Sequence, residues 1–234
     1  SQWSLLSKIS HKNEKREIDL SFLGSRGRDI GKTNRASLTN PTWYPREDQN
    51  LIQFHWLEKN IAGGEVSWHA YLNPNFLETK SEKLGNYKSQ ESYSKTKSTD
   101  YGFQLSYGKK LDQKFRWNGG IDFYGRSGVR ADNKDISFDS QGNVTKTFQE
   151  SPYTGGERHD YGIFVSGDYS GLRNLDLAGG IRLDYLAMQA HPGGAIETLK
   201  SHHKALTGFL AGSLKFTPNL IAFINLSRAY RAPG

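Results

Sequence analysis

Cysteine is absent from this chain of 234 residues, and methionine occurs once. Without cysteine there is no disulfide, thiolate zinc site, iron–sulfur cluster or cysteine nucleophile. Long apolar runs are also missing, since no stretch approaches the 18 apolar residues that a membrane-spanning helix needs. No charged-then-apolar leader opens the chain, which starts at Ser1, so we expect a processed chain or a piece of a longer one.

Aliphatic content is low, but aromatic residues and glycine are plentiful. Hydrophobic residues make up 35% of the chain and aromatics 12%, with 25 glycines, and the mean hydropathy is −0.71. Disordered chains lack aromatics, and helical bundles need regularly spaced aliphatic residues. The composition therefore indicates a folded β protein.

Apolar and polar residues alternate along most of the chain, which is the pattern of strands with one apolar face. Ile18, Leu20 and Phe22, for example, are separated by polar residues. With a weaker segment at residues 3–10, the pattern predicts about ten strands. The clear segments are residues 17–22, 52–56, 66–72, 100–107, 115–123, 160–169, 175–185, 206–216 and 220–226.

The predicted connections alternate between short and long. Four long loops are expected at residues 24–50, 73–98, 125–158 and 187–204, and short turns separate them. Such long loops are uncommon in compact soluble domains, but transmembrane β-barrels have short turns at one end and long loops at the other. We therefore expect the connections near Lys88, Gly142, Tyr153 and His191 at one rim and those near Ala62, Asp112, Arg173 and Pro218 at the other.

A membrane face explains the alternation better than a sandwich core does. The clear strands approach the 9–11 residues that a tilted strand needs to cross a bilayer, aromatics bracket several apolar faces, and charges follow the opposite face. We predict an open antiparallel up-and-down meander. A soluble β-sandwich stays the alternative. The membrane interpretation predicts exposed side chains at Trp56, Trp68, Trp117, Ile163 and Leu183.

Two short motifs point to a family. Residues 178–185 read AGGIRLDY, and residues 223–234 read FINLSRAYRAPG. In their order and spacing they resemble the β-barrel of TonB-dependent outer-membrane receptors, in which a Gly-x-Arg-x-Asp strand precedes a Ser-Arg-x-Phe-Arg-Ala-Pro segment. Tyr230 stands where phenylalanine is usual. The matching residues are Gly180, Arg182, Asp184, Ser227, Arg228, Arg231, Ala232 and Pro233.

The resemblance implies an outer-membrane transport receptor of a Gram-negative bacterium that acts as a monomer. The chain would be the middle of a 22-stranded barrel, without the plug domain and the remaining strands. A scarce nutrient such as an iron–siderophore, haem or cobalamin would bind the extracellular loops and be imported with energy from the TonB complex. No catalysis and no resident cofactor are implied. A porin or a barrel enzyme is the alternative within the outer membrane.

Ligand-binding candidates are expected at the loop ends, because they combine charge, metal-binding capacity and stacking there. They are Tyr153, Arg158, His159, His191 and His202.

No metal site is predicted, and His55 and His69, on the polar side of one hairpin, are expected to be hydrogen-bonded wall residues. The net charge of +7 (31 basic minus 24 acidic residues) is spread along the chain. It favours anionic lipopolysaccharide or an anionic chelate, and not nucleic acid, as the electrostatic partner.

Overall fold

A computed structural model describes residues 1–32, 39–194 and 197–229. The described residues form a single antiparallel sheet of ten strands in sequence order, β1 to β10, with every neighbour in the sheet also a neighbour in the chain. They contain no helix that is long and apolar enough to span a membrane. The strands are β1 (Gln2–Lys12), β2 (Arg16–Gly31), β3 (Thr42–Ile61), β4 (Gly64–Leu84), β5 (Lys88–Lys110), β6 (Phe115–Phe138), β7 (Val144–Leu172), β8 (Leu175–Pro192), β9 (Leu199–Thr217) and β10 (Leu220–Arg228).

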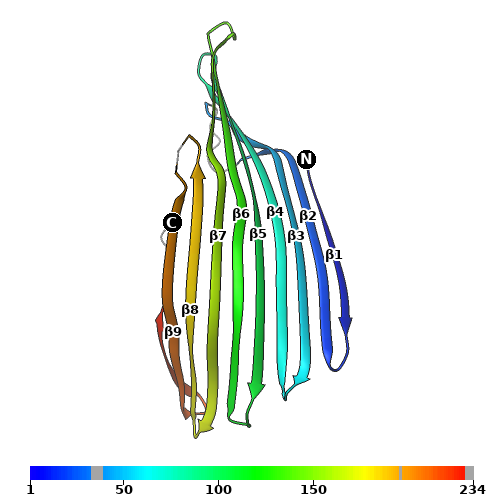
Figure 1. Ribbon diagram of the computed structural model, residues 1–234, viewed down its shortest axis with the longest axis vertical. Helices are drawn as coiled ribbons and strands as arrows, with labels where there is room; N and C mark the ends of the chain where they lie inside the picture. Colours follow the sequence, from blue (N-terminus) through cyan, green and yellow to red (C-terminus); the bar gives the residue numbers. More distant parts are fainter. Residues whose placement is uncertain (33–38, 195–196, 230–234) are drawn as a thin grey trace.

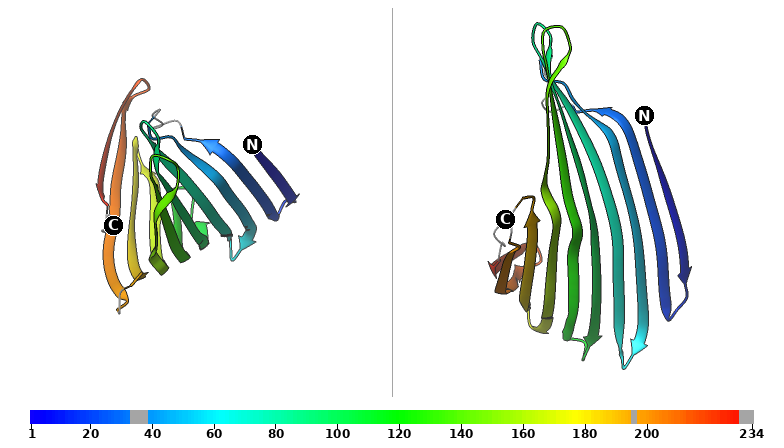
Figure 2. Two further views of the ribbon diagram at one scale, coloured as in Figure 1. Left: turned by 90° about the horizontal axis from the view of Figure 1, so that it is seen from above. Right: turned by 45° about the horizontal axis from the view of Figure 1, so that its top comes forward.

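The sheet curves but does not close. Seen from above, it forms an arc that is open between β1 and β10 (Figure 2). This confirms the predicted meander of about ten strands and leaves no second layer for a sandwich core. Among the described residues, Leu186 is the only large hydrophobic side chain that is buried.

The two ends of the sheet differ, and we call them the turn end and the extended end. The turn end carries the connections after β1, β3, β5, β7 and β9, whereas the other four connections lie at the extended end. Side-chain caps hold the tight turns: Asp112 Oδ1 accepts hydrogen bonds of 2.7 Å from the backbone N–H groups of Lys114 and Phe115, and Asn13 caps the first turn in the same way. The predicted division of the connections between two rims is confirmed, except that Tyr153 lies within β7 and not in a connection.

The predicted long loops, however, are wrong in extent. Strands β4 to β7 continue through residues predicted as loops, and β4 pairs with β5 in unbroken register as far as Lys83 and Gln90, with one register shift before the last pair, Leu84 and Lys88. Only residues 85–87 and 139–143 connect these hairpins. In Figure 1 the hairpins rise above the rest of the sheet at the extended end. Their serine, threonine and lysine residues carry no apolar periodicity, so the sequence pattern did not indicate strands there, but neighbouring strands supply ladder partners over most of their length.

Strand parity divides the side chains between two faces. On one face, a row of directly opposed residues with apolar side chains runs across strands β2 to β8, and we call this side of the sheet the apolar face. The row consists of Leu20, Phe54, Ala70, Phe103, Phe123, Tyr161 and Tyr185. The adjacent row defines the polar face: Asp19, His55, His69, Gln104, Asp122, Gly162 and Asp184.

The apolar face is uncovered, as a lipid-facing surface requires. Ile163 and Leu183 are 55% and 54% exposed. The three tryptophans predicted to be exposed are half-buried, because aromatic neighbours on the same face pack against them. Trp68 makes edge-to-face contacts with Phe54 and Trp56, at ring-centroid distances of 5.0 and 6.2 Å, and Trp117 contacts Tyr107 at 5.4 Å.

Candidate functional site

Arg182 of the AGGIRLDY motif links three strands across the polar face. Its guanidinium donates two parallel hydrogen bonds to the Asp122 carboxylate, at 2.5 and 2.8 Å, and its Nε donates to Asp184 at 2.7 Å. The side chain of Asp122 is fully buried. A buried carboxylate needs such bidentate pairing to offset the loss of its water shell. The motif arginine therefore ties β8 to β6 across the intervening β7, and the motif aspartate holds its guanidinium from the same strand.

Gly162 makes this crossing possible. It lies on β7, directly opposite Asp122 on one side and Asp184 on the other. A Cβ atom built there would overlap both Arg182 Nη2 and Asp122 Oδ1. The sequence did not point to Asp122 or Gly162, because their partner is 20 or more residues away and only the strand register brings them together. The one available signal was a glycine at a polar-face position of an otherwise regular strand.

The two motifs meet in space. Gly180, Phe209 and Ser227 are directly opposed partners on β8, β9 and β10. A pocket of about 610 Å³ there is lined by Gly180, Arg182, Asp184, Ser227 and Arg228, among others. Arg231, Ala232 and Pro233, the remaining motif residues, lie outside the described residues.

Two of the predicted ligand residues, His159 and His202, lie on the apolar face. Each ring nitrogen Nδ1 is 3.0 Å from a tyrosine hydroxyl, Tyr101 for His159 and Tyr185 for His202. His159 also stacks on Phe123, with ring centroids 6.0 Å apart. Amphipathic aromatic rings of this kind form the interfacial belts of membrane barrels. These contacts place both histidines in an aromatic belt near the extended end.

His191 is separate from the other two histidines. Its Nδ1 is 2.9 Å from the hydroxyl of Thr198, and its carbonyl accepts a hydrogen bond of 3.2 Å from Thr154. It therefore fixes the end of the β8–β9 hairpin against β7. The described structure does not bring the three predicted histidines together into one ligand set.

Arg158 and Tyr153 lie nearer to the polar side of β7. Arg158 is opposite Arg126 in the ladder. Each arginine has its own carboxylate, with Arg158 Nη2 2.9 Å from Asp160 and Arg126 Nη2 3.0 Å from Asp100. Tyr153 and Arg126 line one pocket of about 560 Å³. This pair of arginines gives the upper polar face a local excess of donors.

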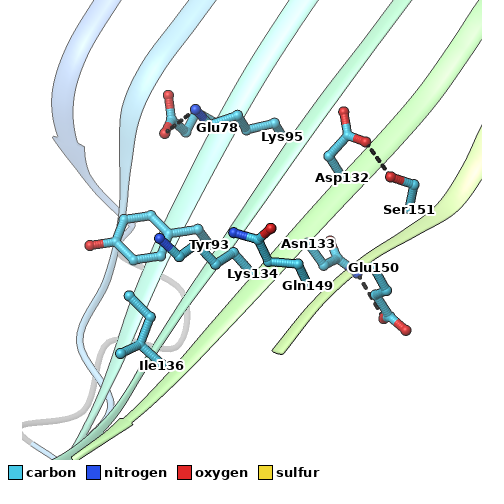
Figure 3. A pocket seen from close by; sticks show the side chains of 10 residues that line it. All are labelled: Glu78, Tyr93, Lys95, Asp132, Asn133, Lys134, Ile136, Gln149, Glu150 and Ser151. Atoms are coloured by element: carbon cyan, nitrogen blue, oxygen red, sulfur yellow. Dashed lines mark hydrogen bonds and ion pairs between the residues drawn. The ribbon is translucent and has the colours of Figure 1, made fainter. Parts of the chain in front are cut away.

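A polar hollow that sequence reasoning missed lies in the extension itself (Figure 3). A pocket of about 580 Å³ is lined by residues of β4, β5, β6 and β7. Lys95 Nζ is 3.4 Å from Glu78, and the Ser151 hydroxyl donates a hydrogen bond of 2.6 Å to Asp132. Lysines, carboxylates and amides offer both donors and acceptors. The lining residues are Glu78, Tyr93, Lys95, Asp132, Asn133, Lys134, Ile136, Gln149, Glu150 and Ser151.

A buried ion cluster adjoins this hollow at Tyr93. Glu91, 8% exposed, accepts from Lys88 at 2.7 Å and from the Tyr93 hydroxyl at 3.0 Å, and Lys80 Nζ is 3.1 Å away. Burial alone would raise the pKa of Glu91, but hydrogen bonds from Lys88, Lys80 and Tyr93 outweigh it and hold the pKa at about 2. Lys80 also lies 5.0 Å from the Trp43 ring centroid, which ties the cluster to β3.

The family comparison agrees with this architecture. The family described as TonB dependent receptor-like, beta-barrel matches residues 10–234, so the chain belongs to that family. Its members are receptors of the Gram-negative outer membrane. A comparison with curated protein sequences finds no match.

Solved structures show the same fold at low sequence identity. The copper transporter OprC aligns with a TM-score of 0.74 and 14% identity over 100% of this chain and 37% of its own. The FrpB iron transporter of Neisseria meningitidis aligns with a TM-score of 0.68 and 16% sequence identity, over 99% of this chain and 36% of the transporter chain. The siderophore receptor PiuA of Acinetobacter baumannii aligns with a TM-score of 0.64 and 10% sequence identity, over 96% of this chain and 46% of the receptor chain. The chain thus spans less than half the length of these structures.

Proposed function

We propose that the chain is part of an outer-membrane receptor that binds a scarce nutrient at the extended end and imports it with energy from TonB. The family match over residues 10–234 carries this proposal. The similar structures are named as transporters or receptors for copper, iron and siderophores. An iron–siderophore, haem, cobalamin or a similar chelate is accordingly the proposed cargo, and no reaction on it is expected.

The proposal places this chain in the middle of a 22-stranded barrel that acts as a monomer. Residues 1–234 would be a partial barrel domain, with the plug and the other strands supplied by the rest of the protein. The open edges at β1 and β10 agree with this, because an unpaired strand edge cannot face lipid. TonB would act through the plug.

Ligand contact is proposed at two places on the extended end. One is the polar hollow, whose residues Glu78 and Lys95 continue the apolar face by strand parity beyond the aromatic belt, and the other is the region of Tyr153 and Arg158 on the polar side. Both present paired charges that can exchange partners with a polar chelate. His191, at the adjacent hairpin end, is a third candidate contact. We assign His159 and His202 to the aromatic belt, because they share the apolar face with their tyrosine partners.

The outer face near the extended end is suited to lipid and lipopolysaccharide. Lys97 and Arg130 are directly opposed there, and Arg26 lies 5.7 Å from the ring centroid of Trp3. Cationic side chains beside an aromatic belt would meet the phosphates of the outer leaflet. Nucleic acid is not a proposed partner.

A passive porin is the competing function, and transport energetics separate the two. Uptake of radiolabelled ferric citrate, a ferric catecholate, haem and cobalamin would be measured in cells with and without the full-length receptor, and in a tonB deletion. The proposal expects uptake of one of these only when both receptor and TonB are present. Receptor-dependent uptake that survives loss of TonB would support the porin, and no uptake of any of the four would contradict the proposed cargo class.

A further inference from the structure

Three metal-ligating side chains gather on the polar face of β2 and β3, near the turn end. One donor atom from each of Glu17, Asp19 and His55 lies within 4.8 Å of the other two. Glu17 and Asp19 are two residues apart on one strand and so share a face. His55 is directly opposite Asp19 in the ladder, with its Nδ1 3.8 Å from an Asp19 oxygen. All three side chains are half-buried.

A second imidazole lies next to this group. His69 of β4 is directly opposite His55, and opposed residues have Cβ atoms about 4.5–5.5 Å apart. The His69 ring is not part of the 4.8 Å group, but a rotation of its side chain would bring a ring nitrogen toward an ion held by His55. Two imidazoles and two carboxylates are the donors that zinc and similar divalent transition metals take in proteins.

Two lysines neutralise the carboxylates when no cation is bound. Lys8 Nζ is 3.3 Å from Asp19, and Lys12 Nζ is 2.8 Å from Glu17. Both lysines come from β1 and are more than half exposed, at 56% and 68% for the side chains. Long, exposed lysine side chains can swing away into water at small cost. They act as competitors for the same oxygens and not as permanent partners.

We propose that Asp19, His55 and His69, with Glu17, form a binding site for one divalent transition-metal ion on the polar wall near the turn end. The site is separate from the polar hollow, which lies at the opposite end of the strands. It does not depend on the transport proposal, because equilibrium metal binding by the purified receptor is measured without any uptake.

The test is zinc titration of the purified, detergent-solubilised full-length receptor by isothermal calorimetry. Replacing His55→Ala and His69→Ala together should remove one zinc equivalent or weaken it by more than about tenfold, since even indirect partners of metal ligands cost 10–100-fold. The double change Lys8→Met and Lys12→Met should act in the opposite direction and tighten binding several-fold. The matched control, His159→Ala with His202→Ala on the apolar face, should leave this zinc equivalent unchanged.

Two results would overturn the site. The first is a receptor that binds no zinc, and the second is a zinc equivalent that persists with unaltered affinity in both the histidine and the lysine variants. Should the histidine variant fail to fold, the lysine variant and an Asp19→Asn variant, which should weaken binding, still decide the question.

Discussion

At the scale of single residues, side-chain contacts on the polar face require glycine at particular strand positions. Arg182 can reach Asp122 only because Gly162 leaves the space above β7 empty. A similar relation holds at Gly102, where a Cβ atom would overlap the rings of Tyr71 and Tyr124 that approach from either side. Glycine in a strand normally weakens it, and its presence often marks a close approach by other groups. Here the approaching groups are the long polar-face side chains that join alternate strands.

Replacing Gly162→Ala should therefore break the bidentate pair and leave the Asp122 carboxylate buried without its partner. Removing one member of a buried ion pair costs about 3–5 kcal/mol. The urea midpoint for unfolding of the purified full-length receptor should fall accordingly. Gly179→Ala on the neighbouring strand is the matched control, because a Cβ there meets only ordinary contacts of 3.5–3.6 Å. Equal midpoints for the two variants would contradict the role assigned to Gly162.

These residue-level contacts mark the limit of what the sequence predicts. Arg182 and Asp184 were identified by their motif, but Asp122, the second carboxylate that Arg182 binds, is 60 positions away from it. Only the register of three strands brings that pair together. The histidines show the same limit, since residue type predicted ligand contact for His159 and His202 but could not show that strand parity places both beside tyrosines on the apolar face.

At the scale of elements, the strands have two differently stabilised halves. Near the turn end, apolar and polar residues alternate, and the sequence predicts these segments correctly. Beyond the aromatic belt, β4 to β7 continue as polar strands, and ion pairs such as Lys80 with Glu91 take the place of apolar packing. Alternation between two polar faces gives no periodic signal. The predicted order of strands was therefore correct, while the extent of the long connections was wrong.

Acid should loosen the β4–β5 extension selectively. The pKa of Glu91 is held at about 2, well below its ordinary value of 4.5. A lowered carboxyl pKa contributes stability that is complete above the ordinary value and is lost as pH falls toward the lowered one. Cleavage of this hairpin by pepsin should thus rise between about pH 4.5 and 2.

Glu91→Gln is the control for this pH effect, because its side chain does not titrate and the protease works equally on both proteins at each pH. The variant should be cleaved readily at pH 4.5 and show little further increase. The quantity to compare is the cleavage rate of the wild-type hairpin divided by that of the variant at the same pH. If this ratio is no higher at pH 2 than at pH 4.5, the Glu91 cluster does not stabilise the extension.

At the scale of the whole molecule, one open sheet separates three environments. The apolar face suits lipid, the polar face suits a wet lumen or a plug, and the strands of the extension carry a polar hollow beyond the aromatic belt (Figures 1 and 3). Strand parity and the strict meander order connect these environments. Because strand order places the connections after β1, β3, β5, β7 and β9 at one end and the other four at the opposite end, a single orientation in the membrane fixes the position of all the connections.

That orientation can be read from cysteine accessibility, since this chain has no cysteine of its own. A cysteine introduced at Gly142, in the β6–β7 connection, should react with a membrane-impermeant maleimide in intact cells that express the full-length receptor. A cysteine in place of Asp112 would remove the side chain that caps this turn, so Gln113→Cys at the turn end is the better counterpart. It should react only after the outer membrane is permeabilised. Labelling of Gln113→Cys but not Gly142→Cys in intact cells would invert the proposed topology and place the polar hollow in the periplasm, away from any external ligand.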